Sequence, residues 1–221
     1  MKTTTQLTAV RSAFTALFAA LICVGCVVSI PVPGTTVPIA VQNLFAILAG
    51  LILGGIQGAG AVGLFIVLGG IGIPVFSGAR GGFGVLFGPT GGYIWGYFFG
   101  ALVAGLIVGK PSIQEKKFKL SMWIKIAVAS FIGFLIVYVP GIPWFMFQMA
   151  KKGSPVTFQK ALALTFTPYI AGDLLKWFVS IPLAAVLRPI AARFLYPADE
   201  KEEAELIEQL KKSKEHESNR S

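Results

Sequence analysis

The sequence is poor in charge and in histidine, and these shortages narrow the classes of protein that it can encode. Only 13% of its 221 residues are charged, whereas soluble domains carry roughly 25%. The one histidine, His216, stands in the charged C-terminal segment, so no Ser–His or Cys–His relay can form within the apolar segments. Asp173 is the one acidic residue inside those segments, too few for a carboxylate-based metal site. We therefore predict neither an enzyme nor a metal centre, and no cofactor.

Cysteine is also scarce, with Cys23 and Cys26 as the only two in the chain. A redox pair needs surroundings that stabilise a thiolate, and a zinc site needs more ligands than two. Within an apolar run, such a pair is typical of small packing residues. The cysteines therefore indicate no redox compartment.

Apolar residues are what the chain has in abundance. They make up 55% of it, and the mean hydropathy is +0.75. The 26 glycines suit helices that pack closely in lipid. The net charge of +9 comes from basic residues at the ends of apolar segments and in the C-terminal tail, a pattern that orientation in a membrane explains better than nucleic-acid binding does. We predict an all-α integral membrane protein with no nucleic-acid partner.

The apolar residues fall into six segments, and a membrane-spanning helix needs about 20 such residues. The segments are residues 12–30, 39–53, 58–73, 93–109, 120–139 and 168–187. The first is predicted to be an uncleaved helix, because the Pro-rich residues 31–38 follow it where a signal peptide would have a small-residue cleavage site. Pro140 and Pro143 are expected to end the fifth. We predict a six-helix transmembrane domain over residues 1–196 and a charged cytoplasmic tail over residues 197–221.

The start of the last segment allows two interpretations. Thr167–Pro168 has the form of a helix start with proline in the first turn, so the sixth helix is predicted to begin at Pro168. The alternative is one longer helix that is kinked at this proline.

Basic residues predict the orientation. Six spans put both termini on one side, and that side collects fourteen of the nineteen Lys and Arg residues, against four on the other. The positive-inside rule then makes both termini cytoplasmic. Asp173 and Lys176 lie near the start of the last segment and therefore open toward the outside.

Asp173 and Lys176 are the most informative residues of the chain. Charges at the level of the bilayer are costly, and they are usually paired and functional. Their i, i+3 spacing places them on one helix face, in a polar stripe with Tyr169 and Ser180 and beside Trp177. Further polar candidates for the same outward-facing cavity are Gln42, Asn43, Arg80 and Tyr93. The alternative is structural: the charges neutralise each other, and Gln42 and Asn43 form hydrogen bonds between helices.

Two other patterns have a simple interpretation. The stretch GLIVGKPS (residues 105–112) differs from a P-loop in its spacing and has Pro111 in place of Ser or Thr, so the chain is not expected to hydrolyse nucleotide by itself. In the first segment, Ala9, Ala13, Ala16 and Ala20 form small-x-x-x-small pairs, which allow either a partner helix or an internal helix to approach closely.

Three features together resemble the BioY family, the biotin-specific S components of energy-coupling factor (ECF) transporters. They are Gln42–Asn43 after a Pro–Ile step, the run LFGPTGGY (residues 86–93) and the run GDLLK (residues 172–176). The resemblance implies a six-helix S component that binds biotin at the outer face of a bacterial cytoplasmic membrane. It also implies a transmembrane T component and two ABC-type ATPase subunits as partners. By resemblance, Asp173, Lys176, Gln42 and Arg80 match the binding positions, and Ala16 and Ala20 match the face presented to the T component.

The chemistry of biotin suits these residues. Lys176 or Arg80 can bind its carboxylate, Asp173 can accept hydrogen bonds from the ureido N–H groups, and Asn43 or Gln42 can donate to the ureido carbonyl. Aromatic side chains such as Trp177, Tyr93 and Tyr169 can cover the ring and the alkyl tail. Alternatives are an S component for another small vitamin, an intramembrane enzyme, or a membrane adaptor that binds no small molecule. The sequence does not distinguish transport by the chain alone from transport that needs the ATPases.

Overall fold

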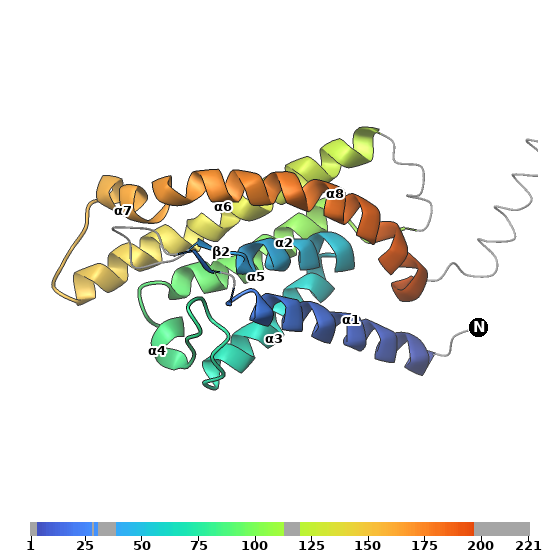
Figure 1. Ribbon diagram of the computed structural model, residues 1–221, viewed down its shortest axis with the longest axis horizontal. Helices are drawn as coiled ribbons and strands as arrows, with labels where there is room; N and C mark the ends of the chain where they lie inside the picture. The colour runs from blue at the N-terminus through green and yellow to red at the C-terminus, as the bar shows by residue number, and fades with distance from the viewer. Residues whose placement is uncertain (1–3, 28, 31–38, 113–119, 197–221) are drawn as a thin grey trace, which may run out of the picture.

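The protein is an elongated bundle of helices, seen in a computed structural model that describes residues 4–27, 29–30, 39–112 and 120–196 (Figure 1). The helices are α1 (Thr4–Val24), α2 (Gln42–Leu53), α3 (Gly55–Gly70), α4 (Phe83–Leu86), α5 (Gly91–Val108), α6 (Leu120–Lys151), α7 (Phe158–Thr165) and α8 (Ile170–Leu195). A 3-10 turn, η2 (Thr167–Tyr169), joins α7 to α8, and the two-residue strands β1 (Ser29–Ile30) and β2 (Ile39–Ala40) form an antiparallel pair.

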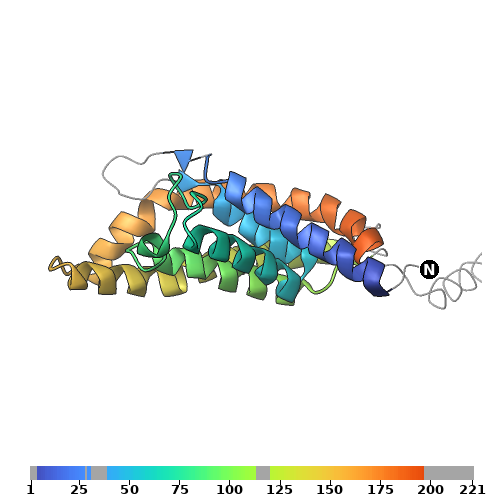
Figure 2. The same cartoon turned by 90° about the horizontal axis from the view of Figure 1, so that it is seen from below.

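The helices lie roughly along the long axis of the molecule, which gives it two distinct ends (Figures 1 and 2). Helices α4 and α7 lie toward one end, which we call the α7 end. The start of α1 and the end of α8 lie together at the other, which we call the terminal end. Predictions for the Pro-rich residues 31–38 and the tail 197–221 concern segments outside the described residues.

Four helical stretches are long and apolar enough to cross a membrane. They are Thr5–Val24, Gly91–Val108, Leu120–Lys151 and Phe158–Leu195. Helices α2 and α3 are apolar but shorter, with 12 and 16 residues, or about 18 and 24 Å at the helical rise, against a hydrocarbon core of about 30 Å. The described chain is therefore a multi-pass, almost entirely helical membrane protein, and the number of six spans stays a prediction.

The expected end of the fifth segment is wrong, because α6 continues through Pro140 and Pro143. Each proline removes a backbone N–H donor, but membrane helices tolerate this loss where neighbouring groups pack against the gap. Gly92 of α5 permits such packing, since a Cβ there would lie 2.4 Å from Trp144 Cβ and 2.7 Å from the Pro140 carbonyl oxygen. The Trp144 indole N–H also donates to the Gly88 carbonyl at 2.9 Å. Packing against α5 thus outweighs the tendency of the two prolines to end the helix.

The boundaries of the first and last helices also differ from expectation. Helix α1 begins at Thr4 rather than at Ser12, and its last residue is Val24. Helix α8 begins at Ile170, just beyond the expected Pro168, and continues to Leu195 instead of ending near residue 187. The turn at Pro168 separates α7 from α8, so a helix start describes this region better than a kink within one helix does.

A glycine seam joins α5 to α6 through their backbones. A Cβ at Gly96 would lie 2.4 Å from the Val137 carbonyl oxygen, and one at Gly100 would lie 2.6 Å from the Gly133 carbonyl oxygen. Real Cβ atoms do not approach so closely, so glycine is required at these positions. Together with Gly92, they let α5 and α6 pack at minimal separation.

Helix α2 is the most enclosed helix of the bundle, and its crossing with α5 depends on Gly50. Eleven of its twelve residues are buried. A Cβ at Gly50 would lie 2.1 Å from the carbonyl oxygen of Ala101 and 2.9 Å from its Cα. Both are main-chain atoms, which cannot move away by changing a rotamer.

We expect Gly50→Ala to destabilise the protein by about 2 kcal/mol, the usual cost of overpacking a filled core. The free energy of unfolding would be measured by SDS titration in mixed micelles. Gly60→Ala is the matched control, because a Cβ at Gly60 of α3 has only Thr15 Cγ2 within 4.0 Å. Equal stability of the two variants would contradict the backbone contact between α2 and α5.

Arg188, one of the basic residues counted for the predicted orientation, is inside the bundle and not on its surface. It is fully buried at 0% exposure. Its guanidinium donates to the Leu51 carbonyl, to the Gly109 carbonyl at 3.3 Å and to the Lys110 carbonyl at 3.3 Å. Leu51 lies near the end of α2, and Gly109 is the C-cap of α5. Arg188 therefore neutralises the negative ends of two helices.

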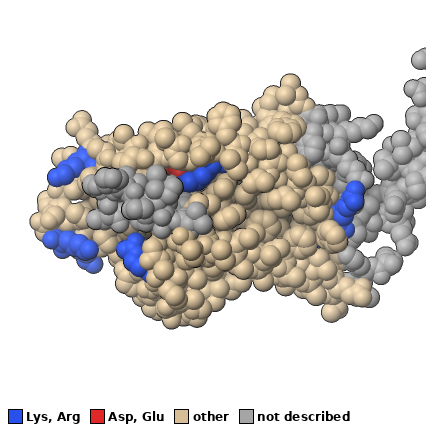
Figure 3. Space-filling view, viewed as in Figure 1, with Lys and Arg blue, Asp and Glu red and all other residues tan. Residues whose placement is uncertain are grey.

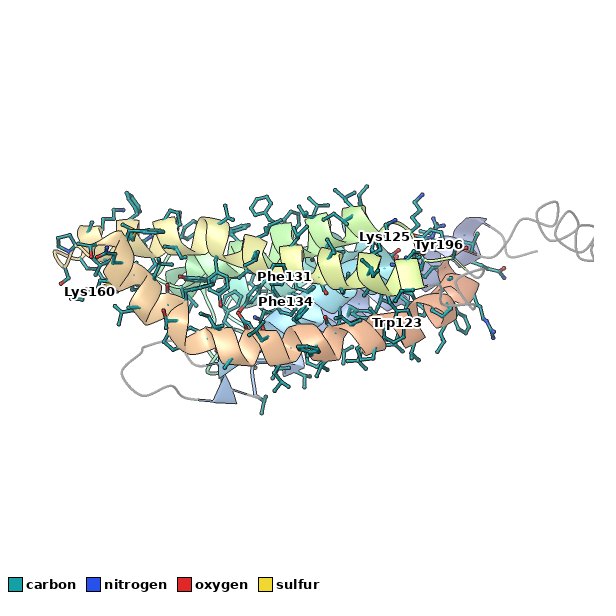
Figure 4. All side chains as sticks on the ribbon, turned by 90° about the horizontal axis from the view of Figure 1, so that it is seen from above. Trp123, Lys125, Phe131, Phe134, Lys160 and Tyr196 are labelled. Atoms are coloured by element: carbon teal, nitrogen blue, oxygen red, sulfur yellow. The ribbon has the colours of Figure 1, made fainter. Side chains whose placement is uncertain are left out.

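On the face shown in Figure 3, basic side chains gather toward the two ends, and the surface between them carries charge only at one small red and blue spot. Lys160 lies at the α7 end, while Lys125 lies at the terminal end (Figure 4). Asp173 is the one carboxylate side chain in the described part of the chain, and Figure 3 shows it in red beside blue basic side chains.

Candidate ligand-binding site

A hydrogen-bonded cluster surrounds Asp173 at the start of α8. Lys176 Nζ lies 2.9 Å from Asp173 Oδ1 and donates to Asn43 Oδ1, also at 2.9 Å. The Asn43 amide N–H donates to Asp173 Oδ1 at 3.0 Å, and the Tyr138 hydroxyl donates to Asp173 Oδ2. The side chains of Asp173 and Lys176 are only 13% and 10% exposed. Groups from α2, α6 and α8 thus stabilise one carboxylate within the bundle.

Aromatic rings enclose this cluster. The ring of Tyr138 lies 5.9 Å from that of Tyr93 and 4.8 Å from that of Phe166, each nearly perpendicular to it. Tyr97 lies one helical turn after Tyr93 on the same face of α5. Such edge-to-face packing fixes ring positions, and a buried phenol also supplies a polar group. The carboxylate is therefore surrounded by rigid walls that carry hydroxyl groups.

A cavity of about 240 Å³ opens beside the cluster, between α6 and α8. Phe131 and Phe134 project into this region from α6 (Figure 4), and Asp173 and Trp177 line it from α8. The Trp177 ring packs against Phe131 at 5.6 Å, and its indole N–H donates to the Ala127 carbonyl at 2.8 Å. The cavity is slightly smaller than the roughly 300–1,000 Å³ of most ligand pockets, so only a small ligand would fit.

A second, smaller hollow lies on the α5 side, where Ser77, Arg80 and Tyr93 contribute to its lining. The Ser77 and Tyr93 hydroxyl groups are buried there, and neither has a hydrogen-bond partner among the described residues. The Arg80 side chain is exposed and donates through Nε to the Ser77 carbonyl at 3.1 Å. Because buried hydroxyls are almost always paired, the hollow offers unused hydrogen-bonding groups beside a cation.

Gln42 has a different environment from its neighbour Asn43. Its amide N–H groups donate to the Ile22 carbonyl at 3.1 Å and to the Val75 carbonyl at 2.6 Å. It therefore ties the end of α1 to the segment between α3 and α4, while it also lines the smaller hollow. Cys26 makes a similar contact, with its thiol donating to the Pro74 carbonyl at 3.7 Å.

The remaining predicted residues fall into two places. Tyr169, 7% exposed, lies in η2 and close to Tyr93, so it belongs to the same region. Ala16 and Ala20 lie on the exposed surface of α1, away from the cluster. The structure thus brings together the predicted residues of α2, α5 and α8, and leaves the two alanines on an outer face.

The sequence did not predict roles for Tyr138, which bonds to Asp173, or for Tyr97, which lines the smaller hollow. The available signal was the low number of tyrosines: the chain has five, and Tyr93, Tyr97, Tyr138 and Tyr169 all lie in or beside apolar segments. A phenol placed there needs a hydrogen-bond partner, and Asp173 was the one acceptor with a charge. For metals, no group of three or more His, Cys, Asp or Glu side chains occurs within the described ranges.

A helical bundle with a buried ion pair, aromatic walls and a small cavity defines the class: a multi-pass membrane protein with a candidate site for a small polar ligand. Comparisons with known proteins give the family. The BioY family model matches residues 1–193, so the chain belongs to the BioY family.

Named relatives and a solved structure agree with this assignment. The biotin transporter BioY of Thermotoga maritima is 35% identical over 174 residues, covering 79% of this chain and 93% of the relative. The biotin transporter BioY of Rhodobacter capsulatus is 39% identical over 169 residues, covering 74% and 85%. A crystal structure of the S component for biotin from an ECF-type ABC transporter matches with a TM-score of 0.71 at 26% identity, covering 85% of this chain and 95% of that one.

Proposed function

We propose that this chain captures biotin with high affinity and takes it up across the membrane as the S component of an ECF transporter. The observation that carries the proposal is the Asp173 cluster, a carboxylate that three donors stabilise beside a small aromatic cavity. A purely structural ion pair is often no better than packed apolar residues, so ligand binding is the stronger reason to keep one. The biotin transporters among the relatives support biotin as the ligand.

The proposed contacts use both ends of the ligand. Asp173 accepts hydrogen bonds from the ureido N–H groups, and Asn43 donates to the ureido carbonyl, exchanging bonds that they now make with each other and with Lys176. Charge-assisted bonds of this kind are about twice as strong as neutral ones. Trp177 and Tyr93 cover the bicyclic ring and the alkyl tail.

The carboxylate of biotin is assigned to the smaller hollow. Arg80 supplies the cation there, and the unpaired hydroxyls of Ser77 and Tyr93 supply donors. Lys176 is less available for this role because Asp173 and Asn43 already engage its ammonium. Gln42 supports the smaller hollow indirectly, because its hydrogen bonds to the Ile22 and Val75 carbonyls hold its side chain in place. Tyr169 lies beside Tyr93 in the same region.

The proposed topology has six spans within residues 1–196 and both termini in the cytoplasm. Helices α2 and α3 complete the count, and their shorter length suits helices enclosed by others. Lys160 and Lys125 lie at opposite ends (Figure 4), as the count of basic residues on the two sides requires, and the side with fewer basic residues is the α7 end. The site then opens to the outside of a bacterial cytoplasmic membrane, and residues 197–221 form a cytoplasmic tail.

The proposed partners are a transmembrane T component and two ABC-type ATPase subunits, which would supply the energy for transport. The exposed alanines Ala16 and Ala20 on α1 provide a small-residue face for a helix of the T component. The matching crystal structure is that of an S component from an ECF-type ABC transporter, and this supports the assignment.

Isothermal titration of the detergent-purified chain tests the proposed ligand. We expect saturable binding of biotin at one site, and no comparable heat from other small vitamins added at the same concentration. Tight binding of a different vitamin would make the chain an S component of other specificity. No binding of any of them by folded protein would favour an adaptor and contradict the proposal.

A further inference from the structure

A cavity of about 410 Å³ at the terminal end has no role in the proposed biotin site. It lies between α1, the turn from α2 to α3, the end of α5 and the end of α8. Its polar lining comes from Arg11, Gln57, Lys110 and Tyr196, and it shares no lining residue with the two cavities near Asp173. Its charges are therefore available for a role outside the proposed biotin site.

Two cations contact the same aromatic ring in this cavity. The guanidinium carbon of Arg11 lies 5.0 Å from the centroid of the Tyr196 ring, and Lys110 Nζ lies 5.8 Å from it. Arg11 also donates through Nε and Nη2 to the Leu195 carbonyl, at 3.2 and 3.1 Å, which fixes its position. Two cations in one cavity give it a positive potential, so an anion bound in the cavity would be stabilised.

The described residues supply no such anion, because their one carboxylate side chain, that of Asp173, belongs to the other site. The walls of the cavity continue into apolar surface: Ile56 and Leu106 line it and are 81% and 60% exposed. A free inorganic anion would make no use of this surface, whereas an acyl chain would cover it.

The level of the cavity also suits a lipid headgroup. Its lining residues stand where helices end: α5 ends at Val108, α8 ends at Leu195, and Gly54 separates α2 from α3. Helix ends mark the boundary between hydrocarbon and water, and basic pockets between membrane helices on the cytoplasmic side bind anionic headgroups.

We infer that this cavity binds an anionic phospholipid, with its phosphate attracted by Arg11 and Lys110 and its acyl chains along Leu106 and Ile56. Tyr196 holds the two cations in place, and Gln57 offers an amide at the rim. The Gln57 amide N–H already donates to the Arg11 carbonyl at 2.9 Å, which leaves its oxygen toward other groups. Under the proposed topology, the lipid belongs to the cytoplasmic leaflet.

Native mass spectrometry of the full chain, titrated with dioleoylphosphatidylglycerol, tests the inference. We expect tighter binding than for dioleoylphosphatidylcholine, and about fivefold weaker phosphatidylglycerol binding in Lys110→Gln, the usual effect of one basic residue near an anionic headgroup. Lys125→Gln is the matched control, since Lys125 is an exposed lysine at the same end and outside the cavity lining (Figure 4). Unchanged biotin affinity shows that each variant is folded.

Three results would overturn the inference. Equal affinity for the two lipids would show that the net negative charge of the headgroup plays no part in binding. An equal loss in Lys125→Gln would indicate attraction to the surface as a whole rather than a site. Millimolar inorganic phosphate could also displace the lipid. If Lys110→Gln then weakened phosphate binding as much as lipid binding, this would be a site for a free anion.

Discussion

Asp173→Asn is expected to weaken biotin binding about a hundredfold, or about 2.8 kcal/mol. The asparagine keeps the shape of the side chain but removes the charge. It leaves the Lys176 ammonium, in a side chain 10% exposed, without its anionic partner. It also replaces one acceptor oxygen by an amide that must donate, so the contacts with Asn43 and Tyr138 cannot all persist. The ligand then loses a charge-assisted acceptor within a reorganised site.

Titration calorimetry of purified Asp173→Asn measures this loss. Ser180→Ala is the matched control on the same helix, because the Ser180 hydroxyl bonds to the Trp177 carbonyl of its own helix and does not line either cavity near Asp173. The control should bind biotin as the unaltered chain does. If Asp173→Asn bound equally well and melted at the same temperature, Asp173 would not belong to the binding site.

Arg188→Met is expected to destabilise the protein by about 3–5 kcal/mol. The methionine keeps part of the apolar stem but leaves the carbonyls of Leu51, Gly109 and Lys110 without this donor. A buried acceptor that loses its partner costs about 1–3 kcal/mol, which applies in full to the Leu51 carbonyl and in part to the half-buried contacts with Gly109 and Lys110. The negative ends of α2 and α5 would also lose the neighbouring positive charge.

SDS titration in mixed micelles gives the free energy of unfolding of this variant. Arg193→Met is the matched control, with the same substitution on the same helix at an exposed position. We expect a change of less than about 0.5 kcal/mol there, as for most surface substitutions. Equal stability of the two variants would mean that water replaces the guanidinium at the three carbonyls.

The sequence predicted those features of the site that follow from cost or local spacing. Asp173 and Lys176 were identifiable because charges in an apolar segment need partners, and their spacing alone placed them on one face. The start of α8 near Pro168 followed from the chemistry of a helix N-terminus. The family resemblance added the ligand and the partners.

Other features depended on contacts between distant segments, which sequence spacing does not contain. The hydroxyl of Tyr138 meets Asp173 across 35 positions of the chain, and nothing local indicates that pairing. Arg188 has the sequence context of a residue at the end of a span, although it is buried against α2 and α5. Pro140 gives a strong stop signal, but α5 packs against it closely enough for α6 to continue.

The glycine seam has a consequence for how the protein discriminates between ligands by size. Helices α5 and α6 carry Tyr93 and Tyr138, and they meet through main-chain atoms at Gly96 and Gly100. A side chain can rotate to admit a bulkier guest, but a main-chain contact cannot. Separating these two tyrosine rings would require an entire helix to shift, so the width of the proposed site would be set by the scaffold and not by any single rotamer.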